Sequence, residues 1–119
     1  PSSVGNLGAL QVLNVQDCRL GGTVPEELSN LANLTYLNLA HNSFMEGLPL
    51  GFGNLTNLVY LLAPNAGFRG SIPGQLGNCK KLRVLNLSYN SLSGPLPDDL
   101  AGVESIESIA LDANHISGQ

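Results

Sequence analysis

Hydrophobic residues recur along this chain with a constant period of 24 residues. The first apolar position of each period holds Leu10, Leu34, Leu58, Leu82 and Ile106. The next two apolar positions hold Leu13, Leu37, Leu61, Leu85 and Ile109, and then Val15, Leu39, Ala63, Leu87 and Leu111. No insertion or deletion breaks the register over the 119 residues. Such a period predicts a repeat architecture, in which each unit buries its apolar face against its neighbours.

Proline, asparagine and glycine follow the same period. The proline position holds Pro1, Pro25, Pro49, Pro73 and Pro97. The asparagine position holds Cys18, Asn42, Ala66, Asn90 and Asn114. The glycine position holds Gly22, Glu46, Gly70, Gly94 and Gly118. Glycine suits unusual backbone dihedral angles, and Glu46 breaks this series, with Gly47 one place late.

The spacing within each unit predicts its elements. Apolar residues two positions apart, such as Leu85 and Leu87, point to one face of a short strand. Stacked units pair such strands into a parallel sheet, about 4.8 Å apart, on the concave side. Proline followed by acidic residues, as in 25–28 and 97–100, suits a one-turn helix on the convex side. We therefore expect an α/β solenoid of about five 24-residue units, with the parallel β-sheet on the concave face and short 3-10 helices and turns on the convex face.

The clearest copy of the unit reads L-x-x-L-x-L-x-x-N-x-L-x-G-x-L-P-x-x-L over residues 82–100. This pattern resembles the leucine-rich repeat, and its G-x-L-P ending is similar to the plant-specific subclass. The resemblance covers the whole chain, residues 1–119, as one leucine-rich-repeat domain. It implies that the asparagine side chain bonds the turns of adjacent units, so Ala66 predicts an irregular third unit. Because the chain starts and stops inside a unit, we expect an uncapped segment of a longer solenoid.

The chain is similar to the ectodomains of plant leucine-rich-repeat receptor-like kinases. Within that family, the runs 85–97 and 104–114 are similar to the large receptors that control anther and sporocyte cell fate. The resemblance implies secretion to the extracellular side of the plasma membrane, glycosylation, and a membrane span and kinase domain elsewhere in the parent. It also implies a small secreted peptide as ligand, together with a co-receptor.

Two other interpretations remain open. Secreted polygalacturonase-inhibiting proteins share this repeat and would make the chain an inhibitor in the cell wall or apoplast. Those proteins tend toward basic concave faces, whereas the few bases of this chain do not align in one strand row. The third interpretation is a purely structural spacer within a long ectodomain.

The positions that alternate with the buried leucines are expected to form the binding surface for a protein or peptide. All three tyrosines of the chain fall in or directly after these rows. The candidate contact residues are Tyr36, Asn38, Tyr60, Leu62, Val84, Asn86, Tyr89 and Asp112. Exposed tyrosines beside asparagines are typical of recognition surfaces, although tyrosine also simply tolerates strand surfaces well.

Three N-x-[ST] sequons predict glycosylation at Asn33, Asn54 and Asn86. We expect Asn33 and Asn54 at or near the convex side. Asn86 lies between two inward leucines and is expected on the concave face, where a glycan would mask part of the binding surface.

Composition and motifs exclude several other functions. With 12% charged residues and a net charge of −4, the chain has no basic stripe for nucleic acid. No apolar run approaches the ~20 residues that span a bilayer. His41 and His115 have no partners at metal-ligand spacing. Glu104, Glu107 and Asp112 are interpreted as a solvated face, so we expect no catalytic residues, no metal and no cofactor.

The two cysteines and the two chain ends complete the expectations. Cys18 and Cys79 fill different columns of the repeat, so we expect both as free, buried thiols rather than a disulfide.

Apolar positions at the uncapped ends are expected to drive end-to-end self-association of the isolated chain. These positions are Val4 and Leu7 at one end and Ile109, Leu111 and Ile116 at the other.

Overall fold

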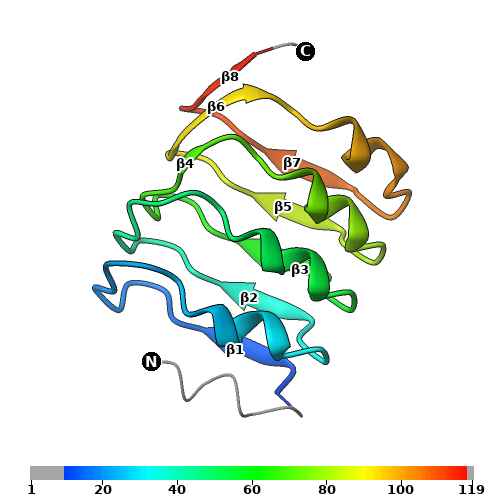
Figure 1. Ribbon diagram of the computed structural model, residues 1–119, viewed down its shortest axis with the longest axis horizontal. Coiled ribbons are helices and arrows are strands. Elements are labelled where there is room, and N and C mark those ends of the chain that lie inside the picture. The colour runs from blue at the N-terminus through cyan, green and yellow to red at the C-terminus, as the bar shows by residue number, and fades with distance from the viewer. Residues whose placement is uncertain (1–9, 118–119) are drawn as a thin grey trace.

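The computed structural model describes residues 10–117, a stack of successive coils that forms a short solenoid (Figure 1). The predicted residues Pro1, Val4, Leu7 and Gly118 lie outside the described range. We number the units from the first apolar position, so that they begin at residues 10, 34, 58, 82 and 106.

Five short strands form the predicted parallel sheet. They are β1 (Val12–Asn14), β2 (Tyr36–Asn38), β3 (Tyr60–Leu62), β5 (Val84–Asn86) and β7 (Ser108–Ala110), in that spatial order. The register pairs Leu13 with Leu37, and Leu37 with Leu61, so the 24-residue period becomes a direct lateral alignment. The central leucines of β2, β3 and β5 are fully buried, as their alternation predicts.

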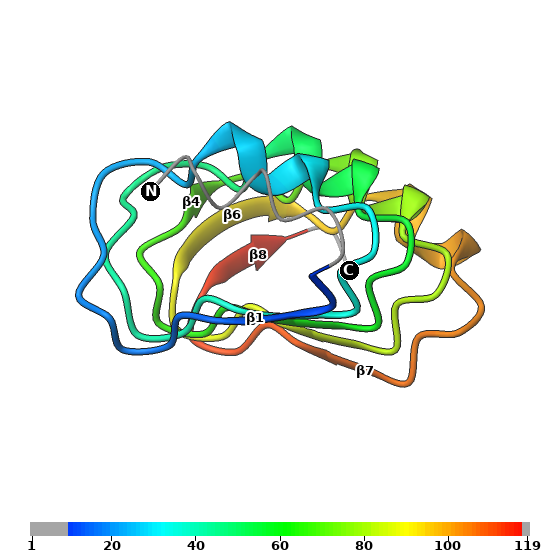
Figure 2. The same cartoon turned by 90° about the horizontal axis from the view of Figure 1, so that it is seen from below.

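A second, smaller parallel sheet lies across the core from the first. It consists of β4 (Arg69–Gly70), β6 (Ser91–Pro95) and β8 (His115–Ser117). Figure 2 shows this sheet in the same layer as the helices, with the core between the two layers. The sequence-based interpretation did not include it, because its strands follow the asparagine turns and lack a strict alternation.

The predicted convex 3-10 helices are present in four units. They are η2 (Glu26–Asn30), η3 (Leu50–Asn54), η4 (Gly74–Asn78) and η5 (Asp98–Gly102), each preceded by a proline of the repeat. Adjacent helices approach so closely that a Cβ on Gly53 would lie 2.6 Å from the Gln75 carbonyl oxygen. Position 53 therefore has no room for a side chain where η3 stacks on η4.

Asparagine side chains join the turns of neighbouring units, as the resemblance implies. Asn90 Nδ2 donates to the carbonyl oxygens of Ala63, Leu87 and Ser88. Asn90 Oδ1 accepts the backbone N–H groups of Ala66 and Phe68, both at 3.0 Å. The same roles fall to Asn42 in the second unit and to Asn114 in the fifth.

The third unit is irregular, as its alanine predicts. Ala66 has no amide to offer, and the backbone N–H of Phe44 instead donates to the Ala66 carbonyl oxygen at 2.9 Å. The rings of Phe44 and Phe68 stack beneath this turn with centroids 5.4 Å apart. Backbone and aromatic packing thus replace one asparagine.

Both cysteines are free, but only one is buried. Cys79 packs in the core, where burial raises the pKa of its thiol to about 11. Cys18 is exposed, which corrects the expectation of a buried thiol. The physical reason is that Cys18 lies in the turn of the first unit, and its sulfur reaches only the Gln16 carbonyl oxygen, 3.6 Å away.

Candidate functional site

The concave sheet carries a hollow of about 430 Å³ over β1, β2 and β3. It is lined by Val12, Asn14, Thr35, Tyr36, Val59 and Tyr60. The register places Val12 beside Tyr36, and Tyr36 beside Tyr60, so three units contribute the same outward position. The tyrosine rings lie 6.0 Å apart and are tilted by 53°. This separation lies within the range that favourable aromatic pairs adopt.

Asn38 has a different role from the one expected. Its side chain is only 5% exposed, so it does not offer a free contact surface. Asn38 Nδ2 donates to Gln16 Oε1 at 2.9 Å and to the Tyr36 hydroxyl at 3.3 Å, and Oδ1 accepts the Ala40 N–H. Both polar atoms of the Asn38 amide are therefore already hydrogen-bonded within the protein. Asn38 holds the Tyr36 hydroxyl and is largely withdrawn from the surface.

The second half of the concave face is more polar. Val84, Asn86 and Leu62 are half-buried, and Asn86 Oδ1 accepts the Ser88 N–H at 3.1 Å. The Ser88 hydroxyl donates to Asp112 Oδ1 at 2.5 Å, which holds the exposed Asp112 side chain in place.

An ion pair lies at the entrance of the same two strands. Arg83 forms a two-point contact with Glu107 at 3.0 and 3.1 Å. This pair cancels the charge of the base that precedes β5, so the strand region presents no net positive charge at Arg83.

Tyr89 lies in the turn after β5 and not on the strand. Its φ of 59° places it in the left-handed region, and its side chain is 62% exposed. The same turn position is left-handed in every described unit, at Asp17, His41, Asn65, Tyr89 and Ala113. Tyr89 therefore belongs to the rim of the sheet, apart from the hollow that contains Tyr36 and Tyr60.

The structure unites some of the predicted contact residues and separates others. Tyr36 and Tyr60 share the hollow, whereas Val84, Asn86, Tyr89 and Asp112 lie along the remaining sheet and its rim. The lining residues absent from the predicted contact residues are Val12, Asn14, Thr35 and Val59. Thr35 and Val59 stand just before their strands, and their shared place in the period was the available signal.

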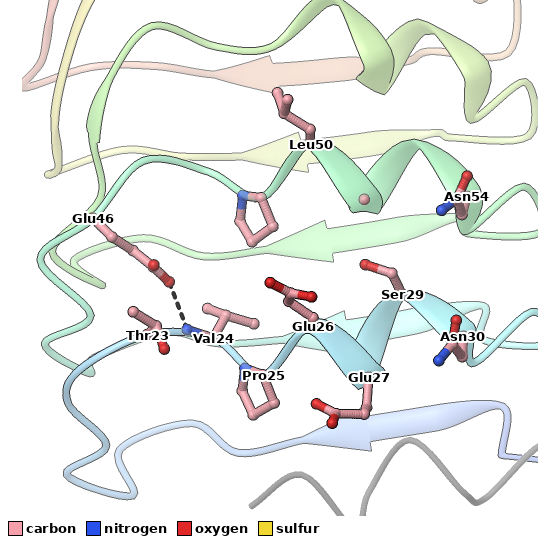
Figure 3. Close-up of a pocket in the computed structure, with 12 residues that line it drawn as sticks. Thr23, Val24, Pro25, Glu26, Glu27, Ser29, Asn30, Glu46, Leu50 and Asn54 are labelled. Atoms are coloured by element: carbon pink, nitrogen blue, oxygen red, sulfur yellow. Dashed lines mark hydrogen bonds between the residues drawn. The ribbon is translucent and has the colours of Figure 1, made fainter.

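A larger hollow, about 1050 Å³, lies on the convex side between η2 and η3 (Figure 3). Glu26, Glu27 and Glu46 line it together with the two prolines and Leu50. Glu46 Oε2 accepts the Val24 N–H at 2.5 Å, so this carboxylate serves the fold. Within residues 10–117, no group of three or more His, Cys, Asp or Glu side chains is arranged to hold a metal ion.

The sequon asparagines lie in different surroundings. Asn54 is exposed and ends η3 on the convex side, as predicted. Asn33 is exposed in the segment between η2 and β2. Asn86 is half-buried on the concave sheet. In the part of the chain that the structure describes, no helix is long and apolar enough to cross a membrane.

Comparison with family models identifies repeats along most of the chain. Residues 71–116 match a model described as leucine rich repeat. Residues 9–31 and 33–55 match a second model of the same description. No curated protein matches the sequence.

Solved structures resemble the chain closely. The Arabidopsis receptor kinase HAESA, in complex with the peptide hormone IDA and the co-receptor SERK1, is 36% identical with a TM-score of 0.96. That match covers 100% of this chain and 20% of the HAESA chain. The plant peptide hormone receptor RGFR1, in complex with RGF2, is 36% identical with a TM-score of 0.90, over 96% of this chain and 18% of that one.

A plant ice-binding protein is also similar, at 36% identity and a TM-score of 0.90 over 96% of this chain and 37% of that chain. The chain spans about a fifth of the length of the RGFR1 and HAESA chains. The fold is shared by proteins with unrelated ligands, so the ligand must be argued from the site.

Proposed function

This chain belongs to the leucine-rich repeat family, and we propose that it is an extracellular segment of a plant receptor-like kinase that binds a peptide or protein on its concave face. The observation that carries the proposal is the hollow formed by Tyr36 and Tyr60 over β1 to β3. Structural neighbours bound to peptide hormones support the class of ligand.

The hollow suits an apolar side chain of an extended peptide. The tyrosine rings offer apolar faces, while their hydroxyl groups remain able to bond a peptide backbone. Tyr36 is held by Asn38, so little side-chain freedom is lost when a ligand binds. The neighbouring half-buried Leu62 and Val84 extend the contact surface along the sheet.

Several features of the whole protein are part of the same proposal. They are secretion, a membrane span and kinase domain outside this segment, a co-receptor, and glycans at Asn33, Asn54 and Asn86. Membership in the receptors that control anther and sporocyte cell fate rests on residues 85–97 and 104–114 alone. The full reading frame and its expression in anthers test these features.

The test of the concave site is a binding screen with a library of synthetic small secreted plant peptides. Peptides that bind the wild-type chain should bind the Tyr60→Ala, Leu62→Ser variant more than about tenfold more weakly, because buried aromatic anchors contribute roughly 2 kcal/mol or more. The circular-dichroism spectrum should not change.

The matched controls are convex. Glu26→Ala and Asp98→Ala should leave affinity unchanged, since these side chains lie in the first turns of η2 and η5. A library without any binder would favour the structural spacer, and binders that are insensitive to the concave variant would place the site on another face.

A further inference from the structure

A third hollow, about 340 Å³, lies on the edge of the solenoid where the chain leaves the concave sheet. Its lining includes Ser43, Met45, Asn65, Gly67 and Arg69. Ser43, Met45, Asn65 and Gly67 belong to the loops that follow β2 and β3, and Arg69 begins β4, which is labelled in Figure 2. The hollow shares no lining residue with the one around Tyr36 and Tyr60.

Two departures from the repeat meet at this edge. In the second unit Met45 has a left-handed backbone, with φ 54°. Units one, three and four instead have a left-handed glycine, Gly22, Gly70 or Gly94, one position later in the repeat. In the third unit Ala66 replaces asparagine and is followed by Gly67, with φ 85°. A Cβ on Gly67 would lie 3.1 Å from the backbone nitrogens of both Met45 and Phe44. The two irregular loops are therefore fitted to each other, and the glycine leaves the hollow open.

Met45 combines an exposed side chain with a strained backbone conformation, which is unfavourable for a purely structural residue. Its side chain is 65% exposed, and a non-glycine residue in the left-handed region costs about 1–2 kcal/mol. Strained residues of this kind concentrate at functional sites. Methionine is also a flexible, polarizable side chain that adapts to a partner surface.

Arg69 gives the hollow its charge. Its side chain is exposed, and the ion pair found among residues 10–117 joins Arg83 and Glu107 instead. The acid on the facing loop, Glu46, directs its carboxylate to the Val24 N–H at the convex hollow (Figure 3). The Arg69 guanidinium therefore has no carboxylate partner in the described structure. Guanidinium groups bind carboxylates through two parallel hydrogen bonds.

We propose that this edge hollow is a second binding site, for a segment of another protein that presents a carboxylate next to an apolar side chain. The carboxylate binds Arg69, and the apolar side chain packs on Met45. Such a site leaves the concave hollow free, so one chain can hold two partners at once.

The experiment selects a random 12-residue peptide display library against the 119-residue chain, and then measures the affinity of synthetic copies of the selected peptides. We expect one group of peptides rich in Asp or Glu beside Leu, Ile or Phe. Arg69→Gln should weaken their binding about tenfold, the effect of removing a charge-assisted two-point contact. Met45→Ser should weaken it several-fold, and Tyr60→Ala should not change it.

The matched control is Arg19→Gln, because Arg19 is also an exposed arginine but does not line the edge hollow. Binding that falls equally with Arg19→Gln indicates general charge attraction and overturns the proposal. A selection without any Arg69-dependent peptide also overturns it, whether or not Tyr60-dependent peptides appear. A dimer of the chain that Met45→Ser dissociates in sedimentation would assign the hollow to a second copy and would equally overturn it.

Discussion

The turns of the third and fourth units close the same step of the solenoid by different chemistry. In the fourth unit the Asn90 side chain makes five hydrogen bonds, three to the turn of the third unit and two within its own turn. In the third unit a backbone carbonyl, that of Ala66, accepts the Phe44 N–H, the counterpart of the Phe68 N–H that Asn90 bonds. In the described residues, no buried side-chain nitrogen or oxygen lacks a hydrogen-bond partner, as folded proteins require.

The difference teaches where this molecule is free to vary. The Asn90 side chain hydrogen-bonds neighbouring backbone groups without a change in backbone conformation, so the fourth unit keeps the regular conformation of the repeat. A backbone substitution changes the loop itself, and Gly67 must then fit against Phe44 and Met45. The edge hollow arises only where the repeat is broken, and the hollow around Tyr36 and Tyr60 lies over the same units.

The largest expected effect comes from removing the asparagine of the regular turn. Asn90→Ala should lower the free energy of unfolding by about 4 kcal/mol, since several buried backbone groups lose their partners at roughly 1–3 kcal/mol each. Urea unfolding followed by circular dichroism measures this change.

The reverse substitution is the control. Ala66→Asn should not stabilise the chain, because Ala66 is fully buried and its carbonyl already accepts the Phe44 N–H. We expect a loss of about 2 kcal/mol from burying an amide that lacks partners. If Ala66→Asn instead raised the free energy of unfolding, the bond from the Phe44 N–H to the Ala66 carbonyl oxygen would not fully replace the bonds of an asparagine side chain.

A smaller effect separates the fit of the two loops from backbone strain. Gly67→Ala should destabilise the chain by about 2 kcal/mol, because the left-handed penalty adds to a Cβ contact at 3.1 Å with two backbone nitrogens. Gly22→Ala is the matched control, since Gly22 has φ 72° and no atom within 4 Å of its Cβ position. We expect about 1 kcal/mol there. Equal losses in urea unfolding would mean that the two irregular loops are not fitted to each other.

The sequence predicts the parts of this fold that repeat and misses those that depend on a single loop. The lateral pairing of Leu37 and Leu61 follows from the period, because side chains of equal position stack in a solenoid. The burial of Asn38 does not, since the position alternates outward and Asn86 makes the same turn bond while it stays half-buried. Asn38 differs because its Nδ2 also bonds Gln16 and the Tyr36 hydroxyl. The edge hollow could not be predicted either, because it results from the dihedral angles of Met45 and Gly67.

The smallest expected effect concerns the left-handed position that both turns share. The third unit places Asn65 there and the fourth places Tyr89, with φ 53° and 59°. Asparagine adopts this region at low energetic cost, because its short polar side chain can hydrogen-bond locally, whereas the bulky tyrosine side chain raises the cost. Tyr89→Gly should therefore raise the free energy of unfolding by up to about 1 kcal/mol, and Asn65→Gly should change it little.

Because Tyr89 lies on the rim of the sheet, the same substitution also tests whether its side chain contributes to binding. Its strain stabilises nothing in the fold, because the ring is largely exposed. A variant that gains stability and loses affinity for concave-face peptides would show that the tyrosine is kept for binding. If Tyr89→Gly lost stability instead, the ring would be packing against its neighbours, and Tyr89 would no longer count among the contact residues.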